Sequence, residues 1–304
     1  MSVPFNLKDL DEKTSKKIAK ALTFLPKAAP QFQKFQKFQG SQEPIRMYHT
    51  EKGMTRLPYQ FSCLFFNKRF NQDKLFSKIY SDPNGKFTGR LLDRQKEPFK
   101  ESISYLKKHN TVTIALYPGF GKTFMGVMLA WCLNKRVCVL VHRDNVGKQW
   151  VKSFKQYFSE LGDEHIWFVD NKVKENAKIL VCMDGRTDKI PPLMRDDIGT
   201  LIIDEAHCFC APSKVKPLLA FSPKYVIAET ATPKKDNGME KVIQSICGYH
   251  YIQKTSTKPY YFFILQTNIK YELEDCKNIF GELTNKQISN EDRNNIIIEI
   301  LKSN

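Results

Sequence analysis

One stretch of eleven residues, Thr113–Thr123, constrains the fold of this chain more than any other. It begins as an apolar strand and runs into a turn with glycines at positions 119 and 121. Apolar residues then recur at helical spacing from Phe124 to Leu133. A strand, a glycine-containing turn and a helix in this order are the context of a phosphate-binding loop. Backbone N–H groups at a helix N-terminus face an anion there, and glycine lets the backbone curl around it.

The same loop predicts a site for ATP and Mg²⁺. We expect the backbone of Pro118, Gly119, Phe120 and Gly121 to cradle the phosphates. Lys122 would then reach the β- and γ-phosphates, and the Thr123 hydroxyl would hold Mg²⁺. The pattern G-x-x-x-x-G-K-[ST] is met except at its first position, where leucine stands at residue 116. Taken alone, an ordinary turn before a core helix would explain the stretch as well.

A second stretch supports the nucleotide interpretation. Three apolar residues at 201–203 lead into Asp204 and Glu205, followed by Ala206 and His207. Acidic side chains at the end of a buried strand lie where open α/β sheets bind their ligands. Asp204 can complete the Mg²⁺ site, and Glu205 can orient and deprotonate an attacking water. The alternative is a solvated acidic turn after a strand.

Three short stretches resemble the motifs of the first RecA-like lobe of superfamily 2 helicases, and they occur in the same order. They are Gly-Phe-Gly-Lys-Thr, Asp-Glu-Ala-His and Thr-Ala-Thr at 230–232. Within that superfamily, Ala231 to Lys235 followed by Asn-Gly-Met at 237–239 resembles the branch of XPB-like and large-DNA-virus (poxvirus-type) transcription helicases. The leucine at position 116 also occurs in the viral group. The resemblance extends over roughly residues 85 to 300.

The resemblance implies further roles. Gln95, four residues after Leu91, would contact the adenine ring, although a single surface glutamine is common. Strand-end residues would couple hydrolysis to the nucleic-acid groove, whereas without the resemblance this segment is an ordinary turn. The candidate coupling residues are His207, Thr230 and Thr232, and the candidates for contact with nucleic-acid phosphates are His142, Arg143 and Lys148. The pattern of His142, Arg143 and Lys148 would look the same in an ordinary solvated loop. The neighbouring Trp150 fits a core position better than a base-stacking one.

Composition favours an intracellular protein. Hydrophobic residues make up 41% of the 304 residues, no apolar run approaches the ~18 that a membrane span needs, and the start lacks a signal-peptide pattern. We therefore expect no membrane segment. The eight cysteines include no Cys-x-x-Cys pair, which predicts reduced core thiols without disulfides or zinc.

The net charge of +16 points to a polyanionic partner, DNA or RNA. Residues 1–90 contain 17 Lys and Arg against 7 Asp and Glu, so most of this excess lies in the first third of the chain. Within it, residues 31–40 repeat Phe, Lys and Gln with a period of three, which suits either base stacking or packing on a neighbour. A basic solubilising surface is the alternative for the whole region.

These patterns predict an α/β fold: a parallel, doubly wound, RecA-like P-loop NTPase domain preceded by a small basic α+β accessory domain. The expected domains are an accessory region at 1–85, an ATP-binding lobe at 86–257, and a linker strand and helix at 258–304 that lead to an absent second lobe. The more local expectations are a helix from Leu7 to Leu25, strands at Ile45–His49, Tyr59–Phe66, Ile179–Met183 and Tyr260–Leu265, a turn at 81–85, a helix N-cap at Asp144 and a capping box at Ser289–Asp292.

Two classes of function follow. The first is the ATP-binding half of a nucleic-acid-dependent ATPase and helicase, which couples hydrolysis to translocation or unwinding once a second lobe is present. That lobe would be encoded separately or lost by truncation, and its arginines commonly contribute ~10³ to 10⁵ in rate. The second is a stand-alone nucleic-acid-binding module with little or no hydrolysis. A nuclease ranks third, because no additional carboxylate cluster suggests a second metal site.

Overall fold

The computed structural model describes residues 2–6, 10–26, 43–51, 53–70, 74–80, 87–158, 161–234, 238–256, 264–272 and 279–302. They fall into two compact units, Met1–Ser256 and Thr257–Asn304. Besides the strand expected at Tyr260–Leu265, four sequence-based expectations lie outside the described residues in whole or in part. These are the Phe-Lys-Gln repeat at 31–40, the turn at 81–85, the helix start at Leu7 and the Lys235–Asn237 part of the helicase-like motif.

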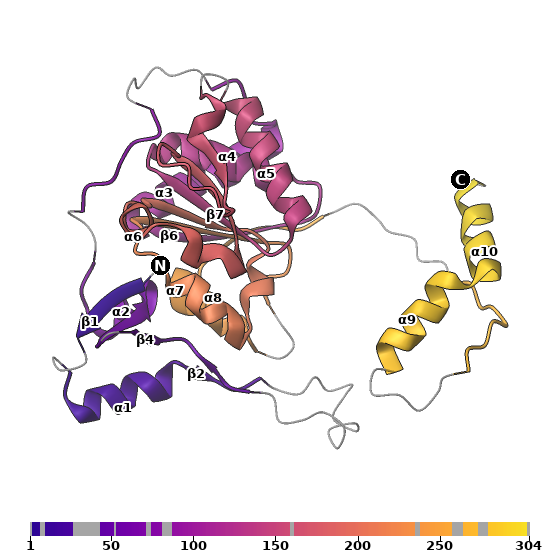
Figure 1. Cartoon of the computed structure of the whole chain (residues 1–304), viewed down its shortest axis with the longest axis horizontal. Helices are drawn as coiled ribbons and strands as arrows, with labels where there is room; N and C mark the ends of the chain where they lie inside the picture. Colours follow the sequence, from indigo (N-terminus) through magenta and orange to yellow (C-terminus); the bar gives the residue numbers. More distant parts are fainter. Residues whose placement is uncertain are drawn as a thin grey trace. The chain divides into compact units, whose positions relative to one another are not determined.

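A seven-stranded, entirely parallel sheet forms the centre of the first unit (Figure 1). Its order is β12-β6-β11-β10-β7-β9-β8. The strands are β6 (Thr111–Leu116), β7 (Val137–Val141), β8 (Ile166–Phe168), β9 (Ile179–Met183), β10 (Thr200–Ile203), β11 (Tyr225–Thr230) and β12 (Tyr251–Lys254). The predicted α/β class with a RecA-like parallel sheet is confirmed.

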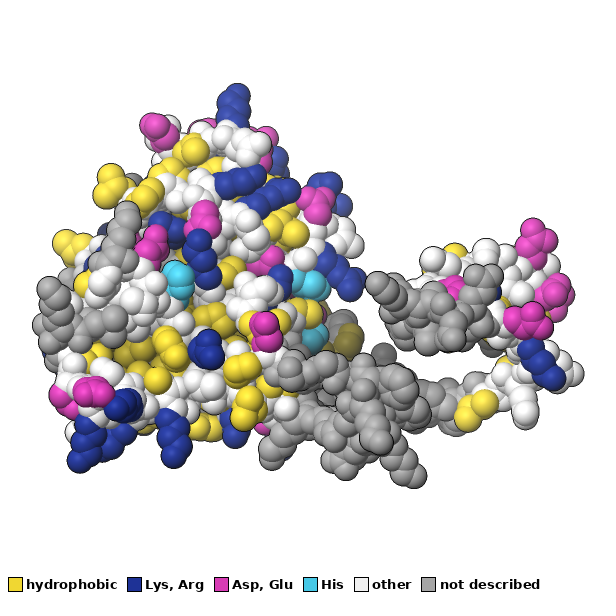
Figure 2. Space-filling view, turned by 60° about the horizontal axis from the view of Figure 1, so that its bottom comes forward, with side chains coloured by type: hydrophobic (Ala, Val, Ile, Leu, Met, Phe, Trp, Pro, Cys, Tyr) yellow, Lys and Arg dark blue, Asp and Glu magenta, His cyan; other side chains and the backbone are white. Residues whose placement is uncertain are grey.

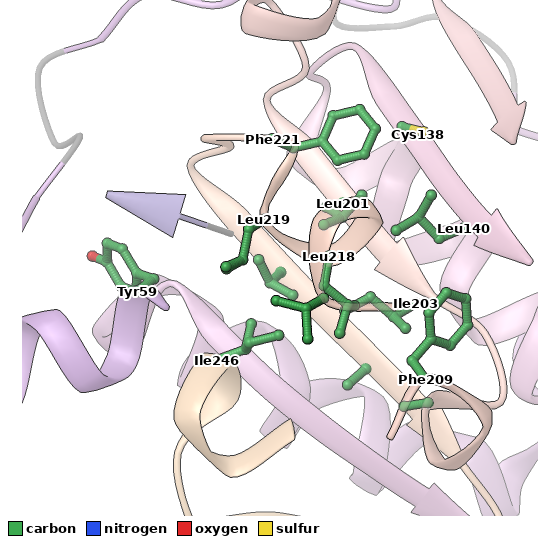
Figure 3. Close-up of a cluster of buried hydrophobic side chains, with 14 of the residues drawn as sticks. Tyr59, Cys138, Leu140, Leu201, Ile203, Phe209, Leu218, Leu219, Phe221 and Ile246 are labelled. Carbon is green, nitrogen blue, oxygen red and sulfur yellow. The ribbon is translucent and has the colours of Figure 1, made fainter. Parts of the chain in front are cut away.

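The central strands are largely apolar because both faces of the sheet are buried. Side chains alternate between two separate hydrophobic clusters: Leu140, Leu201 and Ile203 belong to one, whereas Val139 and Ile202 belong to the other. Figure 3 shows part of the first cluster, where these leucine and isoleucine side chains gather near Leu218 and Phe209. The sheet therefore separates two cores, and each strand contributes to both.

Three long helices share the cluster on the second face. They are α3 (Asp93–His109), α4 (Lys122–Leu133) and α5 (Asp144–Tyr157). The elements on the first face are short: η4 (Asp184–Lys189), α6 (Pro192–Asp196), η5 (Ala206–Phe209), η6 (Pro212–Lys214), α7 (Val215–Leu219) and α8 (Lys241–Cys247), with η3 (Asp163–His165) preceding β8. Asp144 is the first residue of α5 and not its N-cap, which is Arg143 without a capping side chain. The Asp144 carboxylate pairs instead with Lys148, one turn later in the same helix, so the expected N-cap at Asp144 is wrong.

The N-terminal region is a small α+β arrangement on the first face. An antiparallel sheet of order β1-β5-β4 and a β2–β3 pair accompany two helices. The elements are β1 (Ser2–Asn6), α1 (Glu12–Ala21), β2 (Thr23–Phe24), β3 (Ile45–Arg46), β4 (His49–Glu51), β5 (Met54–Pro58) and α2 (Tyr59–Phe65). Its core residues, Val3 and Tyr59 among them, join the same cluster as Leu218 and Ile246 of the lobe. The region is therefore continuous with the lobe's core, and a domain boundary at residue 85 stays a prediction.

The segment Tyr59–Phe65 is a helix, and the strand predicted there is wrong. Pro58 occupies the N-cap position, and inward-facing residues follow at helical intervals, with Tyr59 and Ser62 buried and Phe66 packed on the core. The segment begins with apolar residues at 59, 61 and 63 that alternate with Gln60 and Ser62, and this period of two is typical of a strand, so the local pattern misled the prediction. The two other N-terminal elements also differ: α1 ends at Ala21, and the expected 45–49 strand is divided between β3 and β4.

The second unit contains α9 (Ile279–Ser289) and α10 (Glu291–Lys302). Ser289 ends the first of these helices, so the expected capping box at Ser289–Asp292 is wrong. The cap is Asn290, whose Oδ1 accepts a hydrogen bond from the Arg293 backbone N–H at 2.7 Å. Residues 264 and 265 are not in a strand, and the remainder of the predicted Tyr260–Leu265 strand lies outside the described residues.

Within the described ranges, no helix combines the length and hydropathy required to span a bilayer. The seven cysteines that lie in those ranges are free thiols.

Candidate nucleotide-binding site

Four neighbouring strands of the central sheet end at the candidate site. In the order β6, β11, β10 and β7, they lead into the phosphate loop, the Thr230–Thr232 segment, the Asp-Glu pair and His142. All four are parallel, so their carboxyl ends meet at one edge of the sheet. The sheet topology therefore brings together motifs that lie more than 100 residues apart in sequence.

The loop after β6 has the backbone that a phosphate cradle requires. Gly119 and Gly121 adopt φ angles of +79° and +101°, and α4 begins at Lys122. Nothing lies within 4 Å of the place that a Cβ at residue 119 would occupy, whereas a Cβ at 121 would collide with the Gln95 side chain. Glycine is thus required at 121 both for the left-handed conformation and for space.

The N-terminus of α3 holds this loop in place. The buried Gln95 side chain donates from Nε2 to the Phe120 carbonyl at 2.8 Å, and its Oε1 accepts from the Leu92 N–H at 2.9 Å. Arg94 donates from Nη2 to the Gly119 carbonyl at 3.2 Å. Both polar ends of the Gln95 amide are therefore used within the chain, and its contact with adenine stays a prediction.

Lys122 lies between the loop and the acidic pair. Its Nζ donates to the Leu116 carbonyl at 3.5 Å and lies 3.8 Å from Glu205 Oε1. Thr123, the second residue of α4, is half-buried. The structure thus brings the predicted phosphate ligand and the predicted base to opposite ends of one ion pair.

Asp204 is buried and held by hydrogen bonds on both carboxylate oxygens. Trp150 of α5 donates from Nε1 to Oδ2 at 2.8 Å, and the Glu205 N–H donates to Oδ1 at 3.0 Å. Burial raises the pKa of Asp204, and the Trp150 hydrogen bond opposes that shift by favouring the carboxylate. The indole therefore helps to keep the Asp204 side chain ionised in a position with little water.

Glu205 adopts an unusual backbone conformation. Its φ is +45°, in the left-handed region, which costs a non-glycine residue roughly 1–2 kcal/mol. Its Oε2 lies 3.3 Å from Nδ1 of His207, without forming a hydrogen bond. Conformations of this kind cluster at functional sites. Here the left-handed turn directs the carboxylate toward Lys122 and away from the direction of the strand.

A chain of contacts joins the acidic pair to β11. His207 Nδ1 lies 3.1 Å from the Thr230 hydroxyl, which also accepts the backbone N–H of Thr232 at 3.0 Å. The three residues predicted to couple hydrolysis to nucleic acid are therefore in one hydrogen-bonded group. Their coupling role stays a prediction.

Glu229 is an unexpected member of this region. Its side chain is fully buried on the α4 face, and neither carboxyl oxygen has a hydrogen-bond partner in the described part of the chain. A Cβ at Gly126 would lie only 2.6 Å from Oε1, so the missing side chain of that glycine makes room for the carboxyl group. Burial, followed by the nearby negative charge of Asp204, raises the pKa of Glu229 well above its ordinary value of 4.5.

The three candidates for nucleic-acid contact have different surroundings. His142 is half-buried, with Nε2 3.7 Å from the Cys208 thiol. Arg143 is exposed at the start of α5, and exposed Lys148 pairs with Asp144 at 2.6 Å. Arg143 and Lys148 can face solvent-borne phosphates, whereas His142 is directed to the acidic loop.

Sequence reasoning missed Arg94, Trp150 and Glu229 as parts of the site. Trp150 was expected in the core, and it is 1% exposed, but its N–H contact with Asp204 gives no periodic signal. A glutamate directly before Thr-Ala-Thr in an otherwise apolar strand was the one visible hint for Glu229.

We expect Trp150→Phe to weaken Mg²⁺ binding by about 10- to 100-fold, the usual cost of losing a partner of a metal ligand. The substitution removes the donor to Asp204 Oδ2 and leaves the rest of the ring in place. The measurement is the Mg²⁺ concentration that half-saturates binding of a fluorescent ATP analogue.

The matched control is Trp167→Phe. Trp167 is equally buried and also donates from Nε1 to an aspartate, Asp170, at 3.2 Å, but it lies on β8, three strands from β10. Equal Mg²⁺ requirements in the two variants would contradict the role assigned to Trp150.

The residues present fit ATP and Mg²⁺. The open backbone at Gly119, the helix N-terminus after it and the Lys122 ammonium suit a polyphosphate. Thr123 and Asp204 offer the hydroxyl and carboxylate oxygens that Mg²⁺ prefers.

The comparisons with known proteins agree with this chemistry. Residues 88–235 match the family described as "Type III restriction enzyme, res subunit". "Putative helicase 161L" of Invertebrate iridescent virus 6 is 28% identical over 270 residues, which cover 83% of this chain and 59% of that protein. "Probable helicase D10" of Escherichia phage T5 is 24% identical over 167 residues, 55% of this chain and 35% of the phage protein. The chain thus spans less than two thirds of the length of either relative.

Two solved structures are also similar. The Hef helicase domain of Pyrococcus furiosus has a TM-score of 0.44 and 22% identity, and the alignment covers 55% of this chain and 39% of that one. The UvsW helicase of bacteriophage T4 has a TM-score of 0.42 and 16% identity, with coverage of 77% and 92%. Residues 88–235 of this chain thus match the res-subunit family model, and the chain is similar to proteins named as helicases in iridoviruses and a phage.

Proposed function

We propose that this chain is the ATP-binding half of a nucleic-acid-dependent ATPase of superfamily 2 that acts on DNA. Relatives of the chain are named as helicases. Hydrolysis would be coupled to translocation or unwinding. The single observation that carries the proposal is the junction of Lys122, Glu205 and Asp204 at the ends of β6 and β10, the strands on either side of β11, with Lys122 and Glu205 3.8 Å apart.

The chain's own residues have distinct tasks in the proposed reaction. Backbone N–H groups of the loop at 118–121 and Lys122 bind and orient the polyphosphate. Glu205 accepts the proton of the attacking water at its carboxylate, and His207 Nδ1 lies 3.3 Å from the Oε2 of that carboxylate. Mg²⁺, held by Thr123 and Asp204, would neutralise charge on the phosphates.

A second RecA-like lobe completes the proposed enzyme. The described residues contain one parallel sheet, and the resemblance to superfamily 2 helicases implies cationic groups that reach the phosphates from a second, facing lobe. Such groups commonly contribute ~10³ to 10⁵ in rate. Hydrolysis by these 304 residues is therefore expected to be slow unless that lobe is added from another chain or from a continuation of this one.

The test is ATP binding and steady-state hydrolysis, with and without single- and double-stranded DNA and RNA. We expect Mg²⁺-dependent ATP binding that Lys122→Ala abolishes, together with slow turnover that nucleic acid stimulates. Failure to bind ATP under any of these conditions would refute the proposal.

The basic surface favours one alternative, a nucleic-acid tether that does not use ATP. Residues 1–90 carry a large part of the net charge of +16. This alternative predicts salt-sensitive nucleic-acid binding that neither ATP nor Lys122→Ala changes. The same titrations therefore separate the two functions.

A further inference from the structure

A groove of about 380 Å³ lies between the N-terminal region and α8, and none of its residues belongs to the nucleotide site. It is bordered by two helices of the N-terminal region, α1 and α2, and by α8 of the lobe. The side chains that matter here are Lys20, Phe24, Phe61, Leu64, Lys241 and Tyr249.

The rim of the groove is positively charged. Lys20 and Lys241 are exposed, and no acidic side chain pairs with either of them among the described residues. Lys17 follows Lys13 by four residues, and Lys20 follows Lys17 by three. The three ammonium groups therefore lie along one side of α1. Figure 2, in which the bottom of Figure 1 is turned forward, shows Lys and Arg side chains along the lower edge of the first unit beside hydrophobic ones.

The groove is also lined by exposed apolar and aromatic side chains. Tyr249 is 73% exposed and Leu64 is 65% exposed, although both border a pocket whose floor, Leu22, is fully buried. Large apolar side chains left in water around a pocket mark a binding surface. Phe24 and Phe61 are half-buried along the same lining and add aromatic surface.

We propose that this groove binds single-stranded nucleic acid, with bases stacked on Tyr249 and backbone phosphates beside Lys20 and Lys241. Aromatic faces combined with unpaired lysines are how proteins bind single strands without reading sequence. A duplex hides the faces of its bases, so it cannot use the aromatic part of the groove. The proposal deepens the proposed function, since it rests on nucleic acid being the partner of the ATPase.

Charge distinguishes this occupant from a hydrophobic peptide. Glu240 directly precedes Lys241 in sequence. It lines a different pocket, together with His207 and Thr230. On α1, Glu12 is paired with Lys16 at 2.6 Å. The groove therefore presents unneutralised cations to whatever lies in it, which suits a polyanion.

The experiment measures fluorescence anisotropy of labelled 20-nucleotide oligo-dT, oligo-U and duplex DNA with the whole chain, in the absence of ATP and at several salt concentrations. Tyr249→Ala is expected to weaken single-strand binding by about 5- to 100-fold, and Tyr249→Phe to restore it, because stacking needs the ring and not the hydroxyl. Lys20→Ala and Lys241→Ala should each reduce the slope of log K against log salt by about 0.7. Comparing the two oligonucleotides shows whether the strand is DNA or RNA.

The control for charge is Lys16→Ala, since this α1 lysine is already paired with Glu12 and should leave the slope nearly unchanged. The proposed groove is overturned if Tyr249→Ala leaves single-strand binding intact, or if it weakens duplex binding by the same factor. Either result still leaves a nucleic-acid-dependent ATPase possible. A chain that binds ATP but no nucleic acid at all refutes the groove and the nucleic-acid dependence together.

Discussion

Replacing Glu205 with glutamine is expected to lower ATP turnover by about 10²- to 10⁴-fold, the usual contribution of a positioned general base. The amide has nearly the same shape as the carboxylate but cannot accept a proton from water. ATP binding should be unchanged or tighter, because the substitution frees Lys122 from its ion pair at 3.8 Å. The measurement is single-turnover hydrolysis of labelled ATP beside equilibrium binding of the same nucleotide.

The matched control for this change is Glu164→Gln. Glu164 also lies 3.3 Å from a histidine, His165, but in η3, remote in sequence from the nucleotide site. The Glu164→Gln variant should hydrolyse ATP at the same rate as the original chain. If Glu205→Gln also kept that rate, Glu205 would not be the base, and the carboxylate would be needed only for the ion pair.

Glu229 is expected to make the folded chain less stable as pH rises. The folded protein retains a proton that the unfolded chain releases above about pH 4.5, because burial raises the pKa of this carboxyl group. Unfolding therefore releases a proton, and its free energy falls with increasing pH. The contribution of the protonated group is complete below pH 4.5 and is lost as pH rises toward the raised pKa, at up to about 1.4 kcal/mol per pH unit.

Urea unfolding of the original chain and of Glu229→Gln between pH 5 and pH 8 measures this effect. The amide cannot titrate, so the difference in unfolding free energy between the two proteins should move steadily in favour of the variant as pH rises. Asp204, whose pKa burial also raises, contributes a slope of the same sign to both proteins and so largely cancels in the difference. A difference independent of pH would show that Glu229 is already ionised in the folded chain.

The central strands could be predicted because the signal for each of them lies within a few consecutive residues. Ile179–Met183 is a continuous apolar run, and the structure places it in the buried parallel sheet with the predicted limits, beside the similar run Val137–Val141. The strand-loop-helix at 113–133 was equally readable, since glycine, lysine and helical periodicity follow one another along a few residues. The strand that leads into Asp204 was readable for the same reason.

The errors occur where local patterns are ambiguous or a partner lies far away. The seven residues from Tyr59 begin with a strand-like alternation of apolar and polar side chains, and packing in the shared core decides for the helix. Strands β8 and β12 are only three and four residues long, which is too short for a periodic signal. The Trp150–Asp204 hydrogen bond joins residues 54 positions apart, and no spacing along the chain encodes it.

Strand β11 carries two consecutive polar residues that serve opposite sides of the sheet. Glu229 lies against α4 and α5, and Thr230 contacts His207 on the other side. Because side chains alternate with a period of two, a slip of β11 by one residue against β6 and β10 would exchange the two environments. The carboxyl group would then meet the histidine, and the hydroxyl would enter the space opened by Gly126. An insertion or deletion of one residue inside the strand would therefore disrupt both sides of the site at once.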